Sequence, residues 1–164
     1  MLNVRVATDS DHESIWEIFR EVIAAGKTYP LDRDTPREEA LAYWFQRDAN
    51  VYVAENENGV VGAYTLHANQ SGGGAHIANA GFIVRADARG QGIGRAMGEH
   101  CLAEARRLGF RAMQFNYVIS TNESAVQLWQ QLGMKIIGTL PGAFRHPTKG
   151  YVDVYVMYRS LNDD

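Results

Sequence analysis

The stretch GFIVRADARGQGIGRAM, residues 81–97, joins an apolar run to a turn with three alternate glycines. Glycine has no side chain, so Gly90, Gly92 and Gly94 let the backbone come close to a bound group, and Arg89 adds a positive charge beside them. A strand that turns directly into a helix also directs unpaired amides and the positive end of the helix dipole to one point. The stretch therefore predicts an anion site, with phosphate as the leading guest.

Two familiar phosphate-binding motifs do not match this turn. The phosphate loop of nucleotide hydrolases has Lys and then Ser or Thr after its last glycine, whereas Arg95 and Ala96 follow here. A dinucleotide-binding turn follows the first strand of its domain, and this turn lies in mid-chain. A tight strand-to-helix connection without a ligand is the structural alternative, but three alternate glycines exceed what such a connection needs.

Length and composition favour one folded domain, 1–164. The net charge of -3 provides no basic field for nucleic acid. The opening residues MLNVRVATDSDHE lack the pattern of a signal peptide, and no apolar run approaches the ~20 residues that span a bilayer. The single cysteine, Cys101, stands among apolar neighbours, which indicates buried packing rather than a disulfide or a zinc site. We expect a cytoplasmic protein without a membrane, nucleic-acid or metal partner.

Hydrophobic periodicity predicts a mixed α/β domain. Alternating residues predict strands over 2–8, 50–55, 60–68, 76–84, 110–118, 134–140 and 151–161. Helical spacing with capping residues predicts helices over about 9–25, 35–47, 92–108 and 120–133. The segment NENG at 56–59 predicts an antiparallel hairpin, and we expect PGAFRHPTKG, 141–150, to form a loop.

Two motifs together resemble the GCN5-related N-acetyltransferase (GNAT) family. Arg89, Gly92 and Gly94 match its signature of Arg or Gln, two residues, Gly, one residue, then Gly or Ala. The segment TNESAVQLWQQLGMKIIG, 121–138, is similar to the family's second motif, in which Asn begins a helix that ends before a glycine. The resemblance implies one GNAT domain with a central mixed, mostly antiparallel sheet flanked by helices. It also implies acetyl-CoA as co-substrate, an amine acceptor, no metal, and a homodimer.

The resemblance assigns acetyl-CoA to the glycine turn and the end of the fourth strand. Backbone amides of the turn would hold the pyrophosphate, and an amide near Phe82 would polarise the thioester carbonyl. The expected cofactor-binding residues are Phe82, Ile83, Val84, Arg89, Gly90, Gln91, Gly92, Ile93, Gly94, Arg95 and Asn122.

The proton donor and the general base that are usual in the family are absent. Many members carry Tyr where this chain has Trp129, and an indole N–H is too weak an acid to protonate a thiolate. Asn122 is the candidate donor to the sulfur, with an ordinary helix cap as the structural alternative, and Tyr117 is the alternative acid. Strand 76–84 has no carboxylate. His76 could serve as the base, with an exposed histidine at the strand edge and without function as the alternative, and an ordered water relay could otherwise take the amine proton.

Asparagines within the predicted strands point to a small acceptor. Asn79 and Asn116 stand where Asn is disfavoured, and neighbouring parallel strands would bring them to one cleft, with a bulge or a strand end as the structural alternative for each. With Asn122, their spacing resembles that of the fungal N-acetyltransferases that detoxify azetidine-2-carboxylate and related proline analogues. That resemblance implies that Asn79 and the backbone of Asn116 and Tyr117 bind the acceptor. We expect Tyr29 to wall the acceptor side.

We therefore expect acetyl transfer to the amine of a small molecule, an amino acid or a toxic analogue, as a detoxification reaction. Two alternatives stay open: a protein N-terminal acetyltransferase, which needs an open peptide groove, and a non-catalytic CoA-binding sensor. Arg145 and His146 are a further pair that could bind an acceptor carboxylate, with simple solvation as the alternative.

Overall fold

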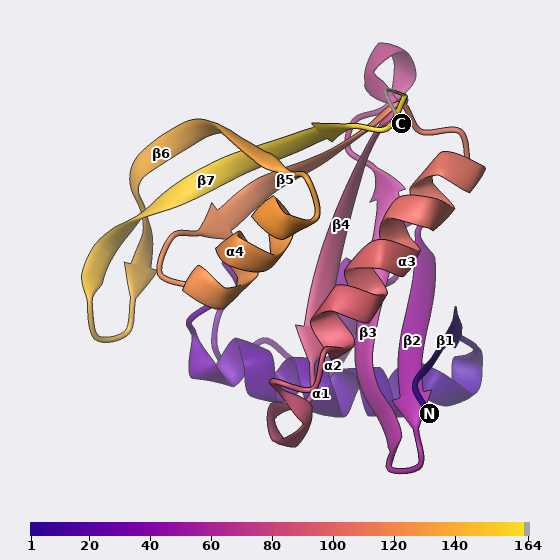
Figure 1. The fold of residues 1–164 in the computed structure, drawn as a ribbon. Coiled ribbons are helices and arrows are strands. Elements are labelled where there is room, and N and C mark those ends of the chain that lie inside the picture. Colours follow the sequence, from indigo (N-terminus) through magenta and orange to yellow (C-terminus); the bar gives the residue numbers. More distant parts are fainter. Residues whose placement is uncertain (163–164) are drawn as a thin grey trace.

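The computed structural model describes residues 1–162, which form a seven-stranded sheet with helices on both faces (Figure 1). The strands are β1 (Asn3–Val6), β2 (Asn50–Asn56), β3 (Gly59–Ala68), β4 (Ile77–Val84), β5 (Ala112–Ile119), β6 (Lys135–His146) and β7 (Gly150–Ser160). The helices are α1 (His12–Ala25), α2 (Arg37–Trp44), α3 (Ile93–Arg107) and α4 (Glu123–Gln131). Short 3₁₀ turns span Asp9–Asp11, Gly72–Gly74 and Ala86–Ala88. Within this part of the chain no helix is long and apolar enough to cross a membrane.

The sheet has the order β1-β2-β3-β4-β5-β7-β6, and among the described strands only β4 and β5 pair in parallel. The predicted mixed, mostly antiparallel sheet is confirmed. The pairing of β4 with β5 covers only Ile77–Ala112 and Ala78–Met113, and the two strands then diverge (Figure 1). We call this opening the β4–β5 fork, bounded by residues 79–84 and 114–119. It leaves one edge of each strand without a partner strand.

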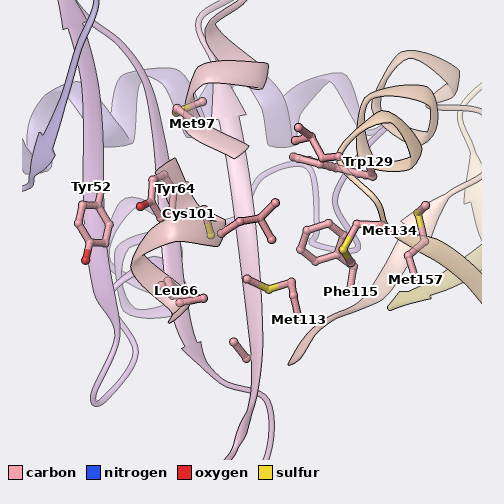
Figure 2. Close-up of a cluster of buried hydrophobic side chains, with 14 of the residues drawn as sticks. Tyr52, Tyr64, Leu66, Met97, Cys101, Met113, Phe115, Trp129, Met134 and Met157 are labelled. Atoms are coloured by element: carbon pink, nitrogen blue, oxygen red, sulfur yellow. The ribbon is translucent and has the colours of Figure 1, made fainter. Parts of the chain in front are cut away.

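Alternation along β4 divides the core between the two faces of the sheet. Its even-numbered residues, such as Phe82, pack with α3 and α4, and its odd-numbered Ile83 packs with α1 and α2. Figure 2 shows the α3–α4 side, where Tyr64, Met97 and Trp129 are buried together. Cys101 is 1% exposed in the same cluster, so the prediction of buried packing is confirmed.

Two glycines of α3 bring α4 close to it. A Cβ at Gly98 would lie 2.6 Å from Leu132 Cδ1 and 3.1 Å from the ring of Trp129, and a Cβ at Gly94 would lie 3.3 Å from Leu128 Cδ2. Side chains at these positions would force the helices apart. The third glycine of the quoted turn therefore serves helix packing, while α4 follows β5 and places its first turn beside the fork (Figure 1).

The prediction of a loop over 141–150 is wrong, because β6 continues to His146 and only residues 147–149 form the turn to β7. The register with β7 shifts between Leu140 and Phe144, which accommodates Pro141 and Gly142. Proline is tolerated at such bulges and on edge strands, where its missing N–H breaks no ladder bond. Gly142 has a positive φ of 57°.

An ion-pair network joins β1 to the start of α1. The buried Asp11 accepts hydrogen bonds from Arg5 at 2.8 and 3.0 Å and from the backbone N–H of Thr8 at 2.8 Å. Arg5 also donates to both carboxylate oxygens of Glu55 on β2, each at 2.9 Å. The Arg5 guanidinium lowers the pKa of Asp11, because its hydrogen bonds favour the charged carboxylate.

Candidate active site

The glycine turn ends in an unpaired helix N-terminus. Gly90 and Gly92 have positive φ values of 76° and 80°, a conformation that residues with a Cβ rarely adopt. Gly92 caps α3, and its carbonyl accepts from Ala96 N at 3.0 Å. The amides of residues 93–95 have no helical partner, and a helix of 15 residues adds the positive end of its dipole. The turn therefore fits a phosphate group.

The basic side chains of the turn differ in availability. Arg89 is exposed and has no hydrogen-bond or ion-pair partner within residues 1–162. Arg95 instead donates to Glu99 at 3.2 Å and to Gln131 at 3.4 Å, so it lies between α3 and α4. Beside the turn, a cleft of about 560 Å³ is lined by Asn56, Asn58, Val61, Arg85, Asp87, Ala88 and Gln91.

The edge of β4 directs backbone groups into the fork. At the two ends of the strand, Ile77 O accepts from the N–H of Asn69, just after β3, and the N–H of Arg85, just after β4, donates to Val61 O on β3. Because the direction of these bonds alternates along an antiparallel ladder, Ala80, Phe82 and Val84 direct their N–H and C=O groups away from β3. Their backbone groups therefore face the fork.

Two of these groups are occupied by side chains. Ala80 N donates to Asn79 Oδ1 at 2.8 Å, and the Tyr29 hydroxyl donates to Phe82 O at 3.0 Å. The N–H of Phe82 has no partner among residues 1–162. The middle of the fork thus carries a fixed, unpaired backbone donor, where a developing oxyanion would be stabilised.

Tyr29 is held against a glycine of β4. A Cβ at Gly81 would lie 3.0 Å from the Tyr29 hydroxyl oxygen, so glycine leaves room for that hydroxyl. Burial raises the pKa of Tyr29, and the phenol remains a donor at physiological pH. Ile83, which was expected at the cofactor, is only 3% exposed among α1 side chains, and its backbone pairs with β3. It presents no group to the fork.

On β5, the expected acceptor residues occupy a bulge. The register with β7 shifts at Asn116 and Tyr117, so neither residue has a partner on β7. The Tyr117 hydroxyl donates to Ala143 O on β6. Asn116 donates to Asn69 Oδ1 at 2.6 Å and does not bond to Asn79. Asn116 is therefore tied to Asn69, the residue that follows β3. That both strand asparagines line one cleft stays a prediction.

Sequence reasoning missed Gln114 and Asn69, which complete a row of amides. Gln114 donates to Asn116 Oδ1 at 2.9 Å, and Asn116 in turn donates to Asn69. The spacing of two between Gln114 and Asn116 places them on one face of a strand and could have revealed the pair. Nothing in the sequence around Asn69 indicates its contact with β5.

Asn122 precedes α4 without using its side chain as a cap. Its backbone oxygen accepts from Val126 N at 3.1 Å, and its side chain makes no capping hydrogen bond. Within residues 1–162 the side-chain amide has no other partner, and the residue is half-buried. The structural alternative, that helix capping occupies this side chain, is wrong.

Trp129 fills the position of the missing tyrosine with an apolar ring. Its ring centroid lies 4.7 Å from that of Phe82 and 5.0 Å from that of Phe115, whose side chain Figure 2 shows beside it. Trp129 is 9% exposed, so it serves the core at the base of the fork. His76 is exposed and precedes β4 at the paired end of the fork, where its backbone oxygen accepts from Arg111 N at 2.9 Å.

A second cleft, of about 440 Å³, lies between the α1–α2 connection and the β6–β7 hairpin. Its lining residues are Gly26, Tyr29, Pro30, Leu31, Asp32, Arg33, Phe144, Arg145, His146 and Pro147. Tyr29 both lines this cleft and bonds to Phe82 O, so the cleft borders the β4 edge of the fork. We call it the hairpin cleft. Within residues 1–162 no cluster of three or more His, Cys, Asp or Glu side chains could hold a metal ion.

The model of the acetyltransferase (GNAT) family matches residues 13–134, which include the turn, the fork and α4. The chain belongs to the GNAT family. It is an N-acetyltransferase, and acetyl-CoA is its acetyl donor.

Characterised relatives extend over most of the chain. N-acetyltransferase aca1 of Schizosaccharomyces pombe is 32% identical over 161 residues, 86% of this chain and 77% of the relative. The L-amino acid N-acyltransferase MnaT of Escherichia coli is 25% identical over 144 residues, 85% of this chain and 83% of MnaT.

Solved structures show the same fold. A GCN5-related N-acetyltransferase from Kribbella flavida superposes with a TM-score of 0.93 at 45% identity, over 97% of both chains. The acetyltransferase YncA from Salmonella typhimurium, solved with its cofactor acetyl-CoA, has a TM-score of 0.86 at 24% identity, over 100% of this chain and 96% of YncA.

Proposed function

We propose that this acetyltransferase acts on the amine of a small molecule, an amino acid or a toxic amino-acid analogue. The main support is the position of Tyr29. It donates a hydrogen bond to the backbone oxygen of Phe82, the residue with the unpaired N–H, and it also lines a cleft of about 440 Å³. A cleft of that volume fits a small acceptor. The name of MnaT, an L-amino acid N-acyltransferase, supports the same class.

In this proposal, acetyl-CoA binds at the turn and the fork. Amides of residues 93–95 and the unpaired Arg89 would hold the pyrophosphate, with support from the rest of the turn. The backbone groups of Phe82 and Val84 face the fork and would bind the arm that carries the thioester. We leave Ile83 out of the proposed set, because its backbone bonds to β3 and its side chain is buried.

In the proposed reaction, the neutral amine attacks the thioester carbonyl carbon, and the carbon–sulfur bond then breaks. The Phe82 N–H would donate to the carbonyl oxygen as negative charge develops there. The Asn122 amide, free of capping, would donate to the departing sulfur, whose thiol pKa near 8.5 makes it a tolerable leaving group. The amine proton would leave through water. We keep Asn122 as the donor to sulfur, since the Tyr117 hydroxyl is bonded to Ala143 O.

The acceptor would be held by amide donors. The oxygen of Asn79 is taken by Ala80 N, which leaves its Nδ2 as a donor toward an acceptor oxygen. The bulge at Asn116 and Tyr117 leaves backbone groups without a partner on β7, and these would bind the acceptor carboxylate. Tyr29 would form the wall between the acceptor and the α1–α2 connection.

Thiol release from acetyl-CoA tests this function. The amines offered would be the common amino acids, proline analogues, methionine derivatives, polyamines, aminoglycosides and a short peptide. Turnover confined to one class of amino acid is expected. Turnover with the peptide but with no amino acid would contradict a small-molecule acceptor and favour a protein N-terminus.

We also propose a homodimer that works in the cytoplasm, where it detoxifies its acceptor. The support for a dimer is the exposed apolar surface of the β6–β7 hairpin, formed by Ile136, Ile137, Leu140 and Tyr151. Light scattering after size-exclusion chromatography would give the mass. A monomer at micromolar concentration would contradict the dimer.

A further inference from the structure

The turn of the β6–β7 hairpin fixes the tautomer of a buried histidine. His146, the last residue of β6, is 7% exposed. Its Nδ1 accepts from the backbone N–H groups of Thr148 and Lys149, each at 3.1 Å. A ring nitrogen that accepts two N–H bonds carries no proton, so the neutral ring holds its proton on Nε2.

The Nε2–H of His146 is a free donor. No residue within 1–162 bonds to this atom, and it is not among the buried unpaired polar atoms, so solvent or a ligand can reach it. His146 lines the hairpin cleft together with Tyr29. The cleft therefore contains a hydrogen-bond donor whose direction is set by the turn backbone.

The ring stays neutral and donates only from Nε2. Burial lowers the pKa of His146, and the charges of Lys149 and Lys27 lower it further. A second proton on Nδ1 would also remove the acceptor of both turn amides. His146 is therefore unsuited to act as the missing general base.

The charges around the hairpin cleft favour an anion. Arg145 lines it and forms no ion pair within residues 1–162, and the charges of Lys149 and Lys27 both act on His146. Arg33 also lines the cleft, although its Nε donates to Ala24 O at 2.7 Å. One acidic side chain, Asp32, opposes these cations among the lining residues.

We propose that His146 is a specificity-determining residue whose Nε2–H donates to an oxyanion of the acceptor, at the end remote from the acetylated amine. The proposal rests on the proposed function, because it takes the hairpin cleft as the acceptor's binding site. The position of Tyr29 sets the orientation of the acceptor. Its hydroxyl donates to Phe82 O at the fork, and Tyr29 lines the same cleft as His146. An acceptor with its amine at the fork directs its other end to the hairpin.

The test compares acceptors that differ only in a distal carboxylate or amide: L-glutamate with L-glutamine, and L-aspartate with L-asparagine. The ratio of kcat/KM, carboxylate over amide, would be measured for the wild type, His146→Phe, His146→Gln and the hairpin control Tyr151→Phe. The wild type should prefer the carboxylate. His146→Phe should lower the ratio about tenfold or more, since the lost bond is to a charged group. His146→Gln, which keeps an N–H donor, should restore part of it, and Tyr151→Phe should leave it unchanged.

A second measurement keeps the proposal testable if the hairpin of the variants is loosened. Long-range ¹H–¹⁵N spectra of the CoA-saturated wild type would report the His146 ring as L-glutamate or L-glutamine is added. A saturable Nε2 shift with L-glutamate alone is expected. If none of the amines gives thiol release but the Nε2 shift with L-glutamate is observed, the proposed function is contradicted and the anion site is supported. An equal response to both amino acids, or an equal kcat/KM for both, overturns the proposal.

Discussion

The Tyr29 hydroxyl donates a 3.0 Å hydrogen bond to the backbone oxygen of Phe82, and so ties the α1–α2 connection to the edge of β4. Phe82 is also the residue whose unpaired N–H faces the fork. The acceptor wall and the proposed oxyanion donor thus share one residue. Movement of the α1–α2 connection would therefore change the acceptor cleft and the β4 edge together.

Tyr29→Phe should raise the acceptor KM about three- to tenfold, because one neutral hydrogen bond contributes about 0.5–1.5 kcal/mol. The affinity for acetyl-CoA should change less, since the turn lies apart from Tyr29. Steady-state kinetics and calorimetric titration of acetyl-CoA measure the two effects. Tyr43→Phe is the matched control, because its ring centroid lies 6.3 Å from that of Tyr29 and its hydroxyl makes no hydrogen bond within residues 1–162. Equal effects of the two variants would contradict the assignment.

Gly81→Ala should reproduce the Tyr29→Phe phenotype. The new Cβ would lie 3.0 Å from the Tyr29 hydroxyl oxygen, which has to move away from Phe82 O. Because both changes break the same bond, the double variant should be no worse than the poorer single variant. Acceptor KM values for the wild type, the two single variants and the double variant form the cycle. Additive losses would show that Gly81 acts by another route.

Asn122→Ala should lower kcat by about 10²-fold, the usual effect of removing a donor that stabilises developing charge. Its acetyl-CoA affinity should change little. The free energy of unfolding should stay within about 0.5 kcal/mol of the wild type, because the side chain makes no capping bond. Single-turnover kinetics measure the loss of rate, and urea unfolding measures the change in stability. Ser124→Ala, at an exposed position, is the control. A loss of about 1 kcal/mol with unchanged kcat would restore the helix-cap interpretation.

Gly98→Ala should destabilise the protein by about 1–3 kcal/mol, the usual cost of overpacking a core. The added methyl group would lie 2.6 Å from Leu132 Cδ1, and α4 would have to move from α3. Gly73→Ala is the matched control, since nothing lies within 4 Å of its Cβ position and its φ is not positive. Urea unfolding compares the two. Equal stabilities would show that α4 shifts without cost.

Local patterns predicted the elements of this fold well, because alternation and capping act within a few residues. The strand at 76–84 and the helix after the glycine turn both lie where the sequence placed them. The prediction of a loop at 141–150 was wrong because Pro141 and Gly142 are residues typical of turns. Pairing with β7, formed after the turn, overrides these signals, and a bulge accommodates both residues. Sequence pattern does not record that cross-strand pairing.

The candidate site could be predicted in part. The turn and Phe82 follow from a motif, and the motif fixes where β4 ends. The partners of Asn79 and Asn116 did not follow, because a side-chain amide takes whichever acceptor or donor the fold brings within 3 Å. Contacts such as Asn116 with Asn69 depend on how β4 and β5 diverge beyond Ala78 and Met113, and the pattern of neither strand records that divergence.

Asp11→Asn should reduce the free energy of unfolding by about 2–3 kcal/mol at pH 7, because it leaves part of the Arg5 hydrogen bonding unmade. Arg5 depresses the folded-state pKa of Asp11 below its ordinary value of 3.8, so this stabilisation is present above that value. It is lost as the pH falls below 3.8 and through the lower folded-state pKa. Urea unfolding of both proteins at several pH values measures the difference.

The difference between the wild type and Asp11→Asn should therefore be constant near neutral pH and shrink below pH 3.8. Glu13→Gln is the matched control, because Glu13 pairs with Arg37 at 3.0 Å with 61% of its side chain exposed. An exposed pair of this kind contributes about 0–1 kcal/mol. A difference for Asp11→Asn that stays constant down to pH 3 would mean that the carboxylate charge does not stabilise the junction of β1 with α1.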